Sequence, residues 1–292
     1  MEGIMTRTYI DLHTHSTASD GSDSPEELIK LAKKSNVTTL ALTDHDTVAG
    51  VEEAVETGNE LGVDVIPGCE LGVKTDFGEI HLLGLWLDPK ASRLQKVMGE
   101  LREYRASRNK IIVEKLQALG MDITYGEVLE AAGDGSVGRP HIAQVLVNKK
   151  YFKSVKNVFE EMLCDGGKAY APKKVLSPVD GVKLLKEEGA TVSWAHMCIH
   201  GQSTEYLSDM IATLKPYGLD ALEAYHSEHG DASTRLVVEL AAVHGLALTG
   251  GSDYHGAVKP NIALGRGKGG LYVPHSVLDN LKELRRKQGL PV

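Results

Sequence analysis

Two pairs of side chains that commonly bind metals share the same spacing near opposite ends of the sequence. His13 and His15 are separated by one residue in the stretch DLHTHSTASDGS, and Asp253 and His255 repeat this spacing in SDYH. Residues two apart in a strand point to the same face, so each pair can hold one ion. Imidazole combined with carboxylate suits Zn²⁺, Mn²⁺ or Fe, so the pairs predict metal chemistry.

Further imidazoles and carboxylates follow other apolar segments. The candidate metal ligands are His13, His15, Asp20, His45, Glu70, His81, His196, Asp253 and His255. A lone histidine at a strand end is more often exposed or hydrogen-bonded than a ligand, and one HxH pair is weak evidence. Two pairs together with TDHD and the glutamate of GCE are harder to attribute to chance, because a buried polar cluster without partners costs stability. This number of ligands exceeds what one ion takes, so we expect two or three ions.

Short apolar segments that alternate with helical segments must position these side chains. The predicted strands are YIDLHTHS, TTLALT, VDVIPGCELGV, EIHLLGLWL, TVSWAH, LDALEAYHS and LALTGGSDYH. A helix after the first strand is predicted to begin with a capping box of Ser24 and Glu27, and the next helix is predicted to end at Gly62. This alternation predicts a parallel sheet covered on both faces. Because the polar residues follow the C-terminal ends of the strands, we expect a barrel rather than an open doubly wound sheet.

Residues 92–176 interrupt this alternation with helical patterns. A long helix over residues 94–120 is predicted to bury one stripe of side chains, made of Val97, Leu101, Tyr104, Arg108, Ile111 and Leu119. We therefore predict a barrel domain of residues 1–91 and 177–292. The inserted residues 92–176 are predicted to form a mainly helical subdomain that caps the mouth of the barrel.

Composition and charge limit the possible partners. The 292 residues carry a net charge of −8, which argues against binding duplex DNA but allows a small anionic substrate. The three cysteines are irregularly spaced and form no CxxC motif, which fits a reducing cytoplasm. No apolar run reaches transmembrane length, and the N-terminal segment lacks the apolar core of a signal peptide. We expect a cytoplasmic protein without a membrane partner, and the oligomeric state stays open.

The expected ions limit the type of reaction. Clustered divalent ions can activate water and neutralise the charge of a phosphoryl group, so no separate nucleophile is needed. The sequence has no GxSxG motif and no cysteine beside a base in a recognisable motif. Hydrolysis of a small phosphate ester therefore fits the residues best. A non-catalytic module that keeps the barrel for binding is the alternative from another class, and the complete set of ligands argues against it.

The segments that carry these residues together resemble the PHP (polymerase and histidinol phosphatase) family. They are DLHTHSTASDGS, LTDHDT, PGCEL, HLLGL, AH and GSDYHG, and the resemblance covers essentially the whole chain. It implies an α/β fold, namely a distorted (β/α)₇ TIM-like barrel, with two or three Mn, Fe or Zn ions. The implied grouping assigns His13, His15, Glu70 and Asp253 to one ion, Glu70, His81 and His196 to a second, and Asp20, His45 and His255 to a third.

The same resemblance implies which residues act in catalysis and which bind substrate. The implied catalytic residues are His13, His15, Glu70, Asp253 and His255. The insert and its GRPH motif resemble the branch of the family that hydrolyses nucleotide phosphates. This implies removal of the 3′-phosphate of nucleoside 3′,5′-bisphosphates, and 5′→3′ exonuclease action on short RNA.

Phosphate contacts are implied by the same branch. They are Arg139, Lys173 or Lys174, and His226. Taken alone, each is more often a surface charge or a helix-start residue. Arg139 precedes a proline at a predicted helix start, where phosphate is attracted. A phosphatase for another small metabolite, such as histidinol phosphate, is the alternative substrate class.

Overall fold

The computed structural model describes residues 7–132, 137–172 and 176–292. The chain divides into two compact units, one of residues 1–95 and 176–292 and the other of residues 96–175. We call these the barrel unit and the helical unit. Lys173 and Lys174 lie outside the described residues.

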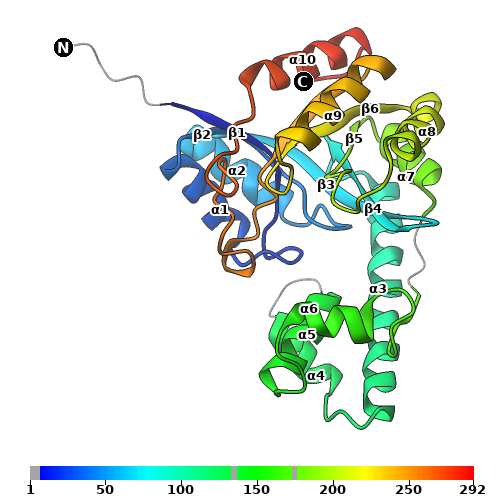
Figure 1. The fold of residues 1–292 in the computed structure, drawn as a ribbon. Helices are drawn as coiled ribbons and strands as arrows, with labels where there is room; N and C mark the ends of the chain where they lie inside the picture. The colour runs from blue at the N-terminus through cyan, green and yellow to red at the C-terminus, as the bar shows by residue number, and fades with distance from the viewer. Residues whose placement is uncertain (1–6, 133–136, 173–175) are drawn as a thin grey trace. The chain divides into compact units, whose positions relative to one another are not determined.

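Seven strands form one sheet in the order of the chain (Figure 1). They are β1 (Tyr9–Thr14), β2 (Val37–Leu42), β3 (Asp64–Thr75), β4 (Gly78–Leu85), β5 (Thr191–Trp194), β6 (Leu219–His226) and β7 (Ala247–Gly251). The mixed α/β class predicted from the sequence is confirmed. The expectation of a parallel sheet is wrong for β4, which is antiparallel to β3 and to β5. The reason is local: only two residues separate β3 from β4, and so short a connection can join only antiparallel strands.

The first and last strands meet, which closes the sheet into a distorted barrel. The backbone N–H of Asp253 donates to the carbonyl of His13 at 2.9 Å, and that of His15 donates to the carbonyl of Tyr254 at 2.9 Å. A Cβ atom at Gly251 would lie 2.4 Å from the Cβ atom of His13. Glycine is therefore needed where β7 approaches β1 most closely.

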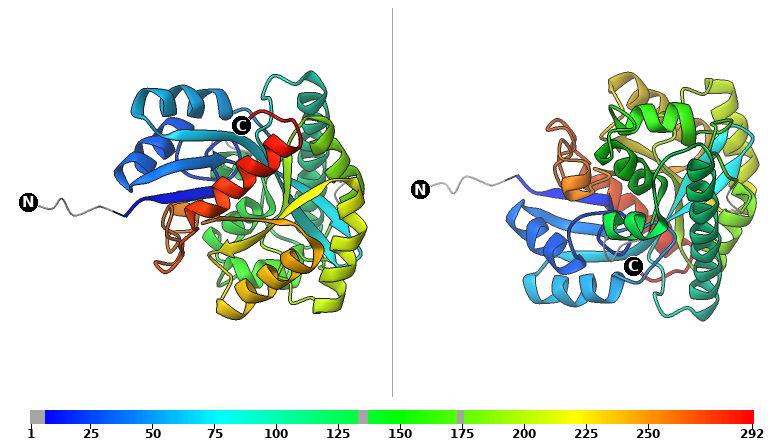
Figure 2. Two further views of the ribbon diagram at one scale, coloured as in Figure 1. Left: turned by 90° about the horizontal axis from the view of Figure 1, so that it is seen from above. Right: turned by 90° about the horizontal axis from the view of Figure 1, so that it is seen from below.

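Helices follow most strands and pack on the outside of the sheet (Figure 2). They are α1 (Pro25–Lys34), α2 (Val51–Leu61), α7 (Pro178–Glu187), α8 (Thr204–Leu214), α9 (Asp231–His244) and α10 (His275–Lys287), with 3₁₀ turns at Lys215–Tyr217 and Gly256–Val258. The predicted capping box is confirmed, since Ser24 Oγ accepts from Glu27 N at 3.2 Å and Glu27 Oε2 accepts from Ser24 N at 2.9 Å. The predicted end of α2 is also confirmed, because Gly62 has a φ of 68°.

The core of the barrel unit joins strands to the last helix. Its buried side chains include Leu12, Ile66 and Leu83 from the strands, and Val277 and Leu281 from α10. Burial of such aliphatic side chains supplies most of the favourable free energy of folding.

The helical unit is built from one long helix and several shorter ones around its own apolar core. Its elements are α3 (Ser92–Ala118), which starts in the barrel unit, α4 (Tyr125–Ala132), α5 (Arg139–Asn148), α6 (Val155–Val158) and a π-helical turn (Phe159–Leu163). Ile112, Leu116, Ile142, Leu146 and Leu163 are buried together. The predicted role of this unit as a cap stays a prediction. None of the described helices is long and apolar enough to cross a membrane.

Candidate metal centre

Backbone pairing beyond the strand ends sets the predicted ligands beside one another. After β2, Glu70 N donates to the carbonyl of Asp44 at 3.1 Å, which places His45 next to Glu70 in a bridge between the two segments. After β5, Ala195 N donates to the carbonyl of His81 at 3.0 Å, which brings the following residue, His196, to the same place. The closure between β1 and β7 aligns His13 with Asp253 in the same way.

Glu70 lies at the centre of the resulting cluster and is 1% exposed. Its Oε2 atom lies 3.2 Å from ring nitrogens of three histidines, and its Oε1 atom lies within 2.9 Å of two more. The three are His13, His15 and His45, and the two are His81 and His196. A carboxylate with imidazoles grouped around each of its oxygens has the geometry to bridge two ions.

Asp253 and Asp20 extend the cluster on its other side. Asp253 Oδ1 lies 3.3 Å from His15 Nε2 and 3.4 Å from His255 Nδ1. Asp20 Oδ1 lies 3.3 Å from His255 Nε2, and Asp20 Oδ2 lies 3.7 Å from His45 Nε2. Every one of the nine predicted ligands is therefore part of one continuous polar cluster.

Several combinations of these side chains could hold an ion. Four groups have ligand atoms within 4.8 Å of one another: His13, His15 and Glu70; His45, Glu70 and His81; His15, Asp20, His45 and His255; and His13, Glu223 and His226. The third group contains the predicted set of Asp20, His45 and His255 and adds His15. Because His15 and Glu70 each belong to more than one group, these groups could share ligands.

Unsatisfied atoms in the cluster provide a test of whether metal ions fit. His13 Nε2, both ring nitrogens of His15 and Glu70 Oε2 are buried and form no hydrogen bond, although they lie close together. Leaving such atoms buried without partners costs roughly 1–3 kcal/mol each. Divalent cations would satisfy imidazole nitrogens and carboxylate oxygens at once, so the donor set fits them.

Electrostatics prepare some of these groups for metal binding. Burial raises the pKa of Glu70, but His45, His81 and His13 outweigh this and hold it well below its usual range, so Glu70 is a carboxylate at neutral pH. Burial lowers the pKa of His45 to about 3 and that of His196 to about 4, which leaves both imidazoles neutral, as metal ligands must be. For His15, the opposing effect of Asp253 and Glu70 outweighs burial and raises the pKa to about 9.

Two candidate ligands have backbone conformations that are uncommon for side-chain-bearing residues. The φ angle is 31° at His196 and 56° at Asp253. A non-glycine residue in this region carries a cost of order 1–3 kcal/mol and persists only where its surroundings enforce it. At His196 the backbone N–H donates to Glu223 Oε2 at 2.7 Å, which fixes this turn.

Glu223 is a functional candidate that the sequence reasoning missed. It lies in β6, is fully buried, and accepts a hydrogen bond from His13 Nδ1 at 2.9 Å. Burial raises its pKa, but His13 outweighs this and lowers it to about 2. Glu223 therefore orients the His13 ring so that Nε2 faces Glu70. The available signal was a lone carboxylate inside the apolar stretch LDALEAYH.

Two buried aspartates hold the loops that carry ligands. Asp44 accepts from Ser16 N, Ser16 Oγ and Ser19 Oγ at 2.8, 2.7 and 2.5 Å, which fixes the loop leading to Asp20. Asp11 accepts from Ser252 N and Ser252 Oγ at 2.7 and 2.6 Å, next to Asp253. Both were passed over because their neighbours in sequence are the more conspicuous histidines.

The predicted phosphate contacts fall in different parts of the chain. His226 is 3% exposed, and its Nε2 atom lies 3.5 Å from Asp253 Oδ2, so it adjoins the cluster. Arg139 begins α5 in the helical unit, where its Nη1 atom donates to the carbonyl of Leu163 at 3.1 Å and its guanidinium lies 5.8 Å from the centre of the Phe159 ring. Lys173 and Lys174 lie outside the described residues.

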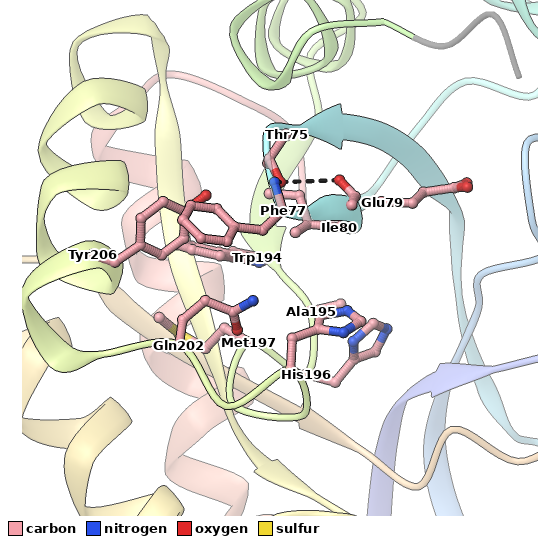
Figure 3. Close-up of a pocket in the computed structure, with 12 residues that line it drawn as sticks. Thr75, Phe77, Glu79, Ile80, Trp194, Ala195, His196, Met197, Gln202 and Tyr206 are labelled. Atoms are coloured by element: carbon pink, nitrogen blue, oxygen red, sulfur yellow. Dashed lines mark hydrogen bonds between the residues drawn. The ribbon is translucent and has the colours of Figure 1, made fainter. Parts of the chain in front are cut away.

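Two cavities adjoin the cluster through its histidines. Figure 3 shows the first, between the β3–β4 turn and the loop after β5, with His196 at one side and Phe77 against Tyr206 at the other. It holds about 10 Å³, enough for roughly one water molecule. The second holds about 520 Å³ and is lined by His226 together with residues of α9 and of the segment before α10. The second cavity is the one with room for a small ligand.

Known proteins are similar in sequence to this chain over most of its length. The PHP domain model matches residues 11–170. The chain is 31% identical over 258 residues to the 5′-3′ exoribonuclease Rnm of Salmonella typhimurium, covering 88% of each. It is 32% identical over 251 residues to the phosphoribosyl 1,2-cyclic phosphate 1,2-diphosphodiesterase of Eggerthella lenta, covering 84% of this chain and 94% of the relative. It is 28% identical over 268 residues to the 3′,5′-nucleoside bisphosphate phosphatase of Chromobacterium violaceum, covering 91% of each.

A solved structure extends the similarity to the fold. A proposed metal-dependent phosphoesterase from Bifidobacterium adolescentis matches with a TM-score of 0.82 at 30% identity, covering 96% of this chain and 97% of that one. The predicted resemblance and the predicted barrel are thereby confirmed, and so is the assignment to hydrolases. The chain belongs to the PHP domain family of metal-dependent phosphoesterases.

Proposed function

We propose that this chain removes the 3′-phosphate from nucleoside 3′,5′-bisphosphates and also degrades short RNA from the 5′ end. The observation that carries the proposal is the Glu70 carboxylate with five histidines around its two oxygens, at the C-terminal end of a PHP barrel. Relatives of about 30% identity named as a bisphosphate phosphatase and as exoribonucleases support the choice of substrate.

The nine clustered side chains are the proposed ligands of two or three Mn, Fe or Zn ions, with His13, His15, Glu70, Asp253 and His255 as the catalytic core. Bound divalent ions supply an activated water and positive charge for phosphoryl oxygens. The residues of this chain provide orientation: Glu223 fixes His13, and Asp44 fixes the loop that carries Asp20. His226 Nδ1 accepts from Glu228 N at 3.1 Å, so the ring hydrogen is on Nε2, which lies 3.5 Å from Asp253 Oδ2 and is proposed to donate to a substrate oxygen.

The cavity of about 520 Å³ beside His226 supports a substrate larger than phosphate alone. Tyr225 and Tyr272 offer aromatic surface to a nucleoside, and Arg235 and Lys268 offer positive charge to a further phosphate. Arg139, with Lys173 or Lys174, stays a proposed phosphate contact on the family resemblance.

The cellular setting of the reaction is proposed from composition and cysteine state. All three cysteines, Cys69, Cys164 and Cys198, are free, which supports a reducing cytoplasm. The net charge of −8 supports a small nucleotide rather than duplex DNA as the partner.

A substrate panel on metal-replete protein tests the proposal. It compares adenosine 3′,5′-bisphosphate, a short 5′-phosphorylated RNA, histidinol phosphate and phosphoribosyl 1,2-cyclic phosphate. We expect the highest kcat/KM with the bisphosphate. Absence of turnover with either nucleotide substrate would overturn the proposal, and turnover of histidinol phosphate alone would establish the small-metabolite alternative. Less than one tightly bound ion per chain would favour a non-catalytic module.

A further inference from the structure

Asp253 uses its two carboxylate oxygens for different neighbours. Oδ1 faces the proposed ligands, lying 3.3 Å from His15 Nε2 and 3.4 Å from His255 Nδ1. Oδ2 lies 2.6 Å from the ammonium nitrogen of Lys259 and 3.5 Å from Nε2 of His226. Asp253 thus connects the nine proposed ligands to two further side chains, of which His226 also belongs to one of the groups that could hold an ion.

Lys259 lies just after the 3₁₀ turn Gly256–Val258, on the loop that follows β7. Its side chain is 41% exposed while its ammonium group is bonded to Asp253, which is only 14% exposed. The lysine therefore reaches into the site from its open side. The Lys30–Glu26 pair of α1 has the same distance of 2.6 Å but lies on the outer surface, where the two side chains are 58% and 52% exposed.

We propose that Lys259 and His226 together bind the phosphoryl group of the substrate, with Lys259 as a substrate-contacting cation supplied by the barrel itself. An ammonium group has three donors, and the bond to Asp253 uses one of them. The remaining donors are available to phosphoryl oxygens beside Asp253. An ammonium group beside metal ions is repelled by their positive charge. The negative charge of a bound phosphate monoester would offset this repulsion.

This assignment differs from the contacts implied by the insert. Arg139 and the lysines at 173 and 174 belong to the helical unit, whereas Lys259 is carried by the same loop as Asp253 and His255. A phosphate bound by Lys259 is thus positioned by the segment that carries two proposed ligands. The inference rests on the proposed function only in requiring a phosphate ester, whatever its leaving group.

The test uses three variants of the full chain. Lys259→Met removes the charge at similar length, Lys259→Arg keeps the charge, and Lys30→Met makes the same change in the exposed Lys30–Glu26 pair. Metal content and the affinity of the metal-loaded protein for inorganic phosphate are measured for each. We expect Lys259→Met to keep its metal and to bind phosphate at least about tenfold more weakly, the loss expected for one hydrogen bond to a charged group. Lys259→Arg should recover most of this loss, and Lys30→Met should match the parent.

Three results would overturn the inference. One is unchanged phosphate affinity in a fully loaded Lys259→Met variant, and another is failure of the loaded parent to bind phosphate. The third is loss of metal with unchanged phosphate affinity at the sites still loaded, which would show that Lys259 only holds Asp253 in place. Because phosphate is the probe, a parent that binds it through Lys259 but hydrolyses no nucleotide would refute the proposed substrate and leave this inference standing.

Discussion

The barrel unit and the helical unit treat buried polar groups in opposite ways. Among the described residues, the buried polar side chains lie in the barrel unit, with Arg108 and Asn109 of the helical unit as the exceptions. The helical unit instead buries aliphatic side chains such as Leu116 and Leu146. Polar burial has a cost that must be offset by a partner or a ligand, whereas aliphatic burial stabilises the fold directly. The polar cluster of the barrel unit therefore lowers the stability of the fold while it supplies the candidate metal ligands. Five substitutions or conditions test this difference between the two units.

The largest effect is expected at the centre of the barrel cluster. Glu70→Gln removes the charge that five histidines share, so metal content should fall and kcat/KM should drop by more than about 10³-fold, beyond the 10- to 100-fold typical of residues that only support ligands. Metal analysis and steady-state kinetics measure both. Glu127→Gln in the helical unit, where Glu127 pairs with Lys149, is the matched control and should leave the metal in place. Full metal content in Glu70→Gln would contradict the central role of this carboxylate.

The helical unit should respond to a cavity rather than to a charge. Leu146→Ala removes a fully buried side chain and should lower the free energy of unfolding of this unit by about 2–5 kcal/mol. Urea unfolding measures the loss, and metal content should stay at the parent level. Ile142→Val, a smaller change in the same core, should cost about 0.5–1.5 kcal/mol. If Leu146→Ala emptied the metal centre, the two units could not be treated as separate in this respect.

An intermediate effect is expected for the residue that orients His13. Glu223→Gln should weaken metal affinity or activity by about 10- to 100-fold, because the His13 ring loses its charged partner. Metal titration and kcat/KM measure the change. Glu26→Gln alters an exposed glutamate of the barrel unit, paired with Lys30, and serves as the control. Equal behaviour of the two variants would show that Glu223 has no positioning role.

Metal affinity of the barrel unit should depend on pH. Without metal, the pKa of His15 is raised to about 9, so an ion must displace a proton from this ring to bind it. The affinity for metal should therefore rise with pH up to about pH 9, by at most about tenfold per pH unit for each proton released. A histidine with a raised pKa stabilises the metal-free fold fully below about pH 6.5, and this contribution is lost as the pH rises toward 9. Proton release during metal titration and the Tm of metal-free protein from pH 6 to 9 measure both. A metal-free Tm that rises across this range would contradict the assignment.

The smallest change is expected at the edge of the cluster. Asp20→Ala removes the carboxylate that contacts His45 and His255, so it should empty one of the expected metal positions while the Glu70 group keeps its ions. Metal content per chain decides between the alternatives. Unchanged metal content and activity would leave a two-metal centre and exclude the three-metal version.

The sequence predicted the location of the cluster better than its supporting structure. Polar residues after apolar strands were recognisable because strand ends share one edge of the barrel. Glu223 and Lys259 were missed because only the tertiary fold shows that they contact His13 and Asp253. The spacing of these residues in the sequence does not indicate either contact. The direction of β4 was wrong because the alternation of strands and helices was extended across a two-residue turn.

The long helix α3 shows that the sequence also predicted only in part which side chains are buried in the helical unit. Of the stripe expected to be buried, Leu101 and Arg108 are buried, but Tyr104 and Ile111 are 39% and 45% exposed. Ile112 and Leu116, which were not expected on the stripe, are fully buried. One residue is 100° of helical rotation, so a helix with apolar side chains on several faces does not define its own buried face. The packing partners of α3 decide it, and they are not visible in a single helix.

Closure of the barrel between β1 and β7 has a consequence for the order of folding. Asp11 and Ser252 hydrogen-bond across a separation of 241 residues, while β3 and β4 pair through a two-residue turn. Contacts between residues far apart in the sequence have a larger entropic cost of loop closure and form more slowly. The β3–β4 hairpin can therefore form long before β1 and β7 meet. A chain emerging from the ribosome therefore cannot assemble the complete cluster until Asp253 and His255 have been synthesised, and the metal centre is among the last parts of the fold to be completed.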